Sequence, residues 1–89
     1  MLGAGQLSSA IWKTRAKRSR HSLRFNVYRL SPHDGRVSHL LRPTDVHDLV
    51  RLCHLLALTL ADDACIPTQQ RRALANLAHR LSQIINTRN

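Results

Sequence analysis

Histidine, cysteine and aspartate are the side chains of this 89-residue chain that could do chemistry. Six histidines suggest a metal site, but His47 and His54 are seven residues apart, about 10 Å along a helix that rises 1.5 Å per residue. One ion cannot bind both side chains across that distance, and the useful helical spacing His-x₃-His is absent. We therefore expect no metal ion and no cofactor.

A nucleophile and base are suggested by Cys53 and His54, but neighbours on a helix point about 100° apart and do not face each other. Cys53 also follows the apolar spacing of its segment, which predicts a buried, structural cysteine. Asp62 and Asp63 are expected in an exposed turn, where aspartates make local hydrogen bonds. With no glycine-rich phosphate loop and no nucleophile elbow, the chain is not expected to be an enzyme.

Charge is the strongest feature of the composition. The chain has 14 Lys and Arg against 5 Asp and no Glu, a net charge of +9. Residues 1–33 contain half of the basic side chains and no acid, an imbalance that favours nucleic acid or another polyanion as partner. The two cysteines are too few for a disulfide framework and lack a C-x-x-C spacing, which favours an intracellular setting.

Residues 1–21 are predicted to be a flexible basic arm, disordered until bound, because a short isolated helix at 6–17 would be marginal in water. Residues 22–89 are then a single small ββαα domain. A β-hairpin is expected at about 22–30 and 36–41, since S-L-R-F-N-V-Y-R-L alternates and S-P-H-D-G is rich in turn formers. The alternation favours a register that pairs Leu30 with Arg36.

Two antiparallel helices are expected at about 44–61 and 68–87, which makes the fold class α+β. The first helix is apolar nearly all round, so it should be buried nearly all round. In a chain this small, the hairpin and the second helix are not large enough to cover the first helix. We therefore predict a homodimer formed through the two helices. No apolar run is long enough to cross a membrane.

The predicted site is electrostatic. Arginine and lysine of the arm should bind phosphates, and the outer face of the hairpin should present residue types that contact phosphates and base edges. The predicted nucleic-acid-binding residues are Lys13, Arg15, Lys17, Arg18, Arg20, Arg24, Tyr28 and Arg36. We accordingly expect a small, dimeric protein that binds nucleic acid, either DNA or RNA.

The stretch R-P-T-D-V-H-D-L-V-R-L resembles the strand-to-helix junction of ribbon-helix-helix DNA-binding dimers, and the strand, helix, helix order from R-V-S-H-L-L-R-P onward resembles their layout. The chain departs from that pattern in having a hairpin, a longer first helix and the link D-D-A-C-I-P, so none of the family's base-reading positions is carried over.

Two alternatives stay open. The chain could be a protein-interaction or assembly module whose apolar first helix docks on a partner while the arm binds an acidic surface. The Arg- and Ser-rich, acid-free residues 1–33 also resemble an import sequence, so location in the cytoplasm or nucleoid competes with import into an organelle.

Overall fold

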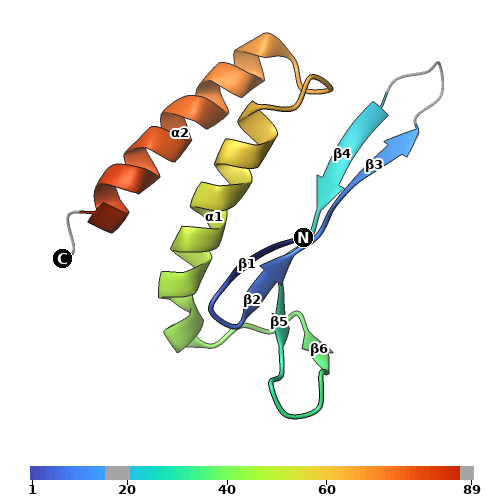
Figure 1. The fold of residues 1–89 in the computed structure, drawn as a ribbon, viewed down its shortest axis with the longest axis vertical. Helices are drawn as coiled ribbons and strands as arrows, with labels where there is room; N and C mark the ends of the chain where they lie inside the picture. The colour runs from blue at the N-terminus through green and yellow to red at the C-terminus, as the bar shows by residue number, and fades with distance from the viewer. Residues whose placement is uncertain (16–20, 87–89) are drawn as a thin grey trace.

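The chain is seen in a computed structural model that describes residues 1–15 and 21–86, and only the backbone of residues 14, 15, 21 and 22. Antiparallel strands and two helices packed on each other confirm the predicted α+β class (Figure 1). The elements are β1 (Leu2–Ala4), β2 (Leu7–Ser9), β3 (Ile11–Arg15), β4 (His21–Phe25), β5 (Tyr28–Leu30), β6 (Val37–Ser38), the 3₁₀ turn η1 (Pro43–Asp45), α1 (Val46–Ala61) and α2 (Thr68–Asn86).

The predicted disordered arm is wrong for residues 1–15, which form β1, β2 and β3. β1 and β2 make a tight hairpin in which Ala4 pairs with Leu7, and Gly5 between them has a positive φ of 60°. Leu7 is fully buried, so these residues belong to the folded unit. β-Branched and aromatic residues such as Ile11 and Trp12 favour a strand, and a run of positive charge does not prevent strand pairing.

Strands β2 to β5 form one long hairpin with a constant register. Leu7 pairs with Arg29 in β2 and β5, and Ile11 pairs with Phe25 in β3 and β4. The Asn26 N–H donates to the Ala10 carbonyl over 3.2 Å between these two sections, which keeps the register across the bend. The β3–β4 section extends beyond the four-stranded sheet β1-β2-β5-β6 and is called the ribbon below.

The predicted hairpin of 22–30 with 36–41 forms only in part, over β5 and β6. β4 pairs with β3, and only β5 pairs with the two-residue strand β6. Leu30 lies opposite Val37 and not Arg36, a shift of one residue. The turn itself forms, with Gly35 at a φ of 68°. Strands β4 and β5 pair with β3 and β2 because these two strands together offer a more extensive ladder than β6 does.

Helix α1 packs its buried side on β1 and β2. The core consists of Leu7, Leu52 and Leu56, with Leu2, Ala4, Ile11, Val27 and Leu49 packed around it. Arg29 strengthens this contact: its Nε lies 3.5 Å from Asp45 Oδ2, and its Nη2 donates to Gln6 Oε1 over 2.8 Å. Asp45, 5% exposed, also accepts the Arg42 N–H at 2.8 Å, so β5 is joined to the start of α1.

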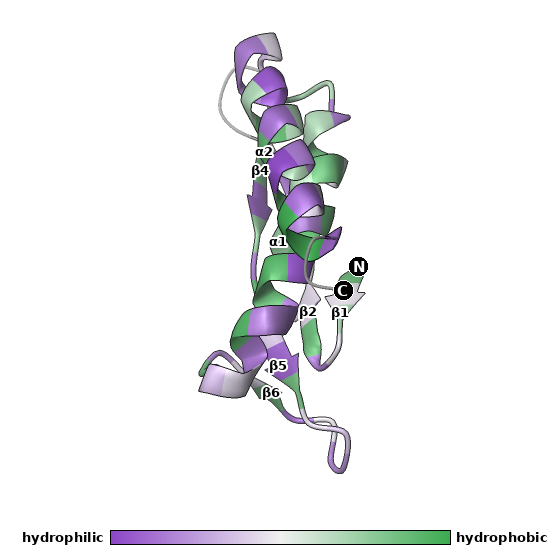
Figure 2. Cartoon of the chain, turned by 90° about the vertical axis from the view of Figure 1, so that its left-hand side faces the viewer, coloured by the Kyte–Doolittle hydropathy of each residue, from purple (hydrophilic) through white to green (hydrophobic). Residues whose placement is uncertain are grey.

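Helix α2 lies along α1 on the side away from the ribbon (Figure 1). The molecule measures 43 × 34 × 16 Å and looks correspondingly narrow from the side (Figure 2). Such a thin arrangement leaves part of α1 exposed within a single chain. Val46 is 57% exposed and Leu58 49%, and Cys53, predicted to be buried, is also exposed.

Candidate nucleic-acid interface

The ribbon is held by five cross-strand pairs, from Ile11 with Phe25 to Arg15 with His21. At its base, the Ala10 N–H donates to Asn26 Oδ1 over 3.0 Å, which adds a side-chain bond to the backbone ladder. Side chains along a strand alternate between the two faces, so directly opposed residues share a face. Each face of the ribbon can therefore be read from the pairing.

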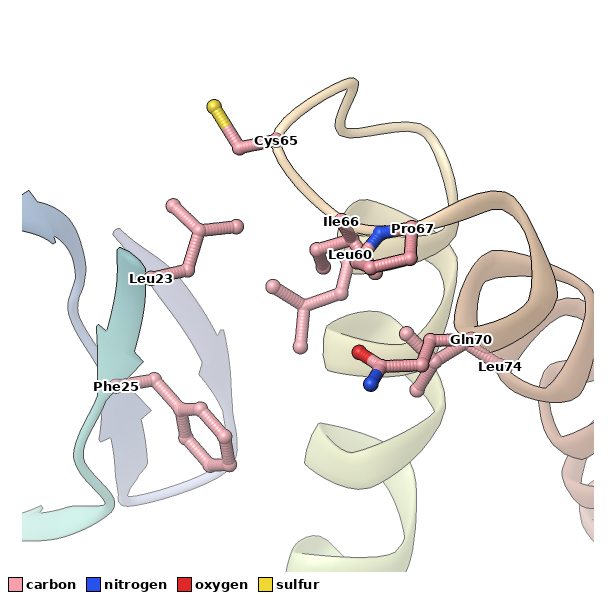
Figure 3. Close-up of a pocket in the computed structure, with 8 residues that line it drawn as sticks. All are labelled: Leu23, Phe25, Leu60, Cys65, Ile66, Pro67, Gln70 and Leu74. Carbon is pink, nitrogen blue, oxygen red and sulfur yellow. The ribbon is translucent and has the colours of Figure 1, made fainter. Parts of the chain in front are cut away.

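One face of the ribbon is turned toward the helices. Leu23 and Phe25 point from β4 toward Leu60 of α1 (Figure 3). Trp12 and Arg24 are opposite each other and occupy the alternate positions, so they leave the ribbon on the face turned away from the helices. Trp12 is 44% exposed and Arg24 is also exposed. An indole and a guanidinium thus lie side by side in solvent.

Lys13 belongs to the face turned toward the helices, because it pairs with Leu23. Its Nζ lies 3.9 Å from Asp63 Oδ2 in the link between α1 and α2. The pKa of Asp63 is lowered from 3.8 mainly because the Cys65 N–H donates to its carboxylate, with further help from the charges of Lys13 and Arg71. The Lys13 side chain is 54% exposed, so this ion pair leaves it accessible to a phosphate.

Three of the predicted residues belong to the strands of the ribbon, Lys13 and Arg15 to β3 and Arg24 to β4, and Lys13 and Arg24 lie on opposite faces. Arg15 is the last residue of β3, while Lys17, Arg18 and Arg20 lie outside the described residues, in the sequence that joins β3 to β4. Arg24 lies opposite Trp12 and not opposite the 36–41 segment, and the shift that pairs Leu30 with Val37 moves Arg36 off the face of Tyr28.

Tyr28 and Arg36 lie in other surroundings. Tyr28 is half-buried in β5, and its hydroxyl donates to Met1 Sδ over 3.1 Å. Arg36 is the last residue of the connection between β5 and β6, which lies at the opposite end of the strands from the ribbon (Figure 1), and its Nε lies 3.5 Å from Asp34 Oδ2. Backbone and side-chain hydrogen bonds from Arg36 and Ser31 lower the pKa of Asp34. Both predicted residues are thus engaged in local contacts.

Trp12 is the surface residue that sequence reasoning missed. The signal is present in I-W-K-T-R, where three β-formers in five residues favour a strand. The expectation of a flexible arm, which rests on a short helix at 6–17 being marginal in water, leaves no strand to present Trp12.

No alternative chemistry emerges from the described parts of the chain. Within residues 1–15 and 21–86, no group of three His, Cys, Asp or Glu is placed to hold a metal ion. Cys53 and Cys65 are free thiols. Among these same residues, no helix has both the length and the apolar character needed to cross a membrane. Comparison with family models, curated proteins and solved structures finds no match to this chain.

Proposed function

We propose that this protein binds nucleic acid through the ribbon. The observation that carries the proposal is the exposed pair of Trp12 and Arg24 on the face turned away from the helices. An exposed aromatic ring can stack on an unpaired base, and a neighbouring arginine can bind the adjoining phosphate in a bidentate way. This combination favours single-stranded DNA or RNA over a duplex.

The charge of the chain supports the same partner. The sequence from Lys13 to Arg24 contains six Lys and Arg and no acid, within a chain of net charge +9. Binding of these cations to phosphates would release counterions, so affinity should fall steeply with added salt.

Trp12 is the single tryptophan of the chain, so its emission reports directly on the proposed surface. Titration with a single-stranded oligonucleotide at low salt should quench that emission, and added salt should reverse the quenching. A duplex of the same sequence is the comparison that separates stacking from simple attraction to phosphate. Unchanged emission with both probes would contradict the proposal.

The homodimer is the second part of the proposal. Two ribbons on one particle would bind a strand with higher avidity than one ribbon does. A protein-interaction module that docks through α1 is the second candidate function, favoured by the exposed Val46 and Leu58 on that helix. The mass of the purified chain separates these functions, because a homodimer needs no other protein to cover its apolar surface.

A further inference from the structure

We infer that one apolar face of the molecule, formed jointly by β4, α1 and α2, is the surface on which a second copy of this chain docks. This inference deepens the homodimer part of the proposed function by naming the surface. The face is called the apolar face below and comprises Leu23, Phe25, Val46, Val50, Cys53, Leu60, Leu74, Leu77 and Ile84.

Three hollows follow one another along the apolar face. A cavity of about 370 Å³ lies between β4 and the start of α2, lined by Phe25 and Leu74 among others (Figure 3). A second cavity of about 200 Å³ shares these two residues and continues to Leu77. A third, of about 250 Å³, lies between the start of α1 and Ile84 near the end of α2. The first two hollows are therefore continuous, and the third lies further along the same two helices.

The exposed area is sufficient for a dimer interface. The chain exposes 6927 Å², whereas a compact monomer of 10.1 kDa exposes about 5,300 Å². The excess, about 1,600 Å² over the whole chain, is larger than the roughly 800 Å² that each partner buries in a standard interface. The radius of gyration, 14.7 Å against about 12 Å for a compact chain of this length, agrees with a unit completed by another copy.

Spacing and charge favour a second copy as the occupant. Val46, Cys53 and Leu60 recur every seven residues on α1, as Leu77 and Ile84 do on α2, and this period suits packing against further helices. None of the residues that line the three hollows is Lys, Arg, Asp or Glu. Two copies of a chain with net charge +9 repel each other, so an uncharged face is where they can meet.

The test is the mass of the full chain in solution, measured by sedimentation over a wide range of concentrations. The wild type should be a dimer of about 20 kDa, twice the 10.1 kDa chain. Leu77→Lys should give a monomer. The matched control is Leu58→Lys, because Leu58 is similarly exposed, 49% against 44%, but lines a different hollow beside His54 and His79. Circular dichroism checks that each variant keeps its helices, and Ile84→Lys replaces Leu77→Lys if the latter unfolds.

A second readout uses Cys53, which the dimer should cover. In a Cys65→Ser background, alkylation of Cys53 should slow as the protein concentration rises. A monomeric wild type would overturn both the inference and the homodimer. A dimer that survives Leu77→Lys and Ile84→Lys would overturn the inference alone. Oligonucleotide binding by the monomeric Leu77→Lys variant tests the nucleic-acid proposal separately, since the ribbon's outer face is untouched.

Discussion

Trp12 and Arg24 lie directly opposite each other on β3 and β4, and both alternate with Leu23 and Phe25, so their side chains leave the ribbon on the face turned away from the helices. Cross-strand neighbours of this kind have Cβ atoms about 5 Å apart, close enough to contact one base and its phosphate together. The basic residues from Lys13 to Arg20 thus belong to strand β3 and to the sequence that joins β3 to β4. The pairing of these two strands fixes the position of part of the positive charge.

Replacement of Trp12 tests the stacking contribution. Trp12→Ala should weaken binding to a single-stranded oligonucleotide by about 1–3 kcal/mol, the usual contribution of one base–aromatic stack. Trp12→Phe should retain part of the affinity because it keeps an aromatic face. Since Trp12 is 44% exposed, the loss of its cross-strand contact should lower the free energy of unfolding by only about 1 kcal/mol. Fluorescence anisotropy of a labelled strand measures the affinity, and equal affinity in all three proteins would argue against stacking.

The Gly5 position tests whether the N-terminal hairpin is packed on α1. A Cβ added at Gly5, where φ is 60°, would collide with the carboxylate of Asp48. At Gly35, where φ is 68°, an added Cβ meets nothing within 4 Å. Both Gly→Ala changes carry backbone strain of about 1 kcal/mol, and Gly5→Ala should cost somewhat more in urea denaturation because the Asp48 carboxylate must also move aside. A smaller cost for Gly5→Ala than for Gly35→Ala would contradict the close approach of Gly5 to Asp48.

The Arg29–Asp45 ion pair should be important for stability. Arg29→Met would leave a buried carboxylate with the Arg42 N–H as its one hydrogen-bond donor among the described contacts, and should cost about 2–3 kcal/mol. Arg36→Met is the control, because the Arg36–Asp34 pair is largely exposed and should contribute less than about 1 kcal/mol. Urea denaturation measures both, and similar effects would contradict the assigned role of Arg29.

Acid should destabilise the link between α1 and α2 through Asp63. Because its pKa in the folded protein is below 3.8, Asp63 stabilises the fold above that value, and this contribution is lost as the pH falls through the folded pKa. Asp63→Asn should therefore flatten the fall in stability below about pH 4. Asp62→Asn removes the same charge one residue earlier and is the control. Thermal melts at a series of pH values around 4 measure the stability of all three proteins. If stability falls with pH equally in the wild type and in Asp63→Asn, Asp63 does not have this role.

Sequence periodicity was enough to predict the two helices and the strand character of residues 22–30. Strand pairing was not predictable in the same way, because alternation specifies which face a residue occupies but not which strand lies opposite. The alternation of S-L-R-F is compatible with Leu23 and Phe25 on one face, as observed, but the strand opposite them is 11–15 and not the expected 36–41. The position of the exposed Trp12 beside Arg24 results from the pairing of β3 with β4, so it could not be predicted from composition and charge.

The most direct test of nucleic-acid binding by the ribbon is a salt titration of binding to a single-stranded oligonucleotide. The logarithm of the association constant should fall linearly with the logarithm of salt concentration, and Arg24→Gln should reduce the slope by about 0.7, the contribution of one phosphate contact. Arg80→Gln, which removes an exposed arginine from α2 on the far side of α1, should leave the slope unchanged. Binding that is absent at low salt, or a slope that Arg24→Gln does not alter, would contradict this function for the ribbon.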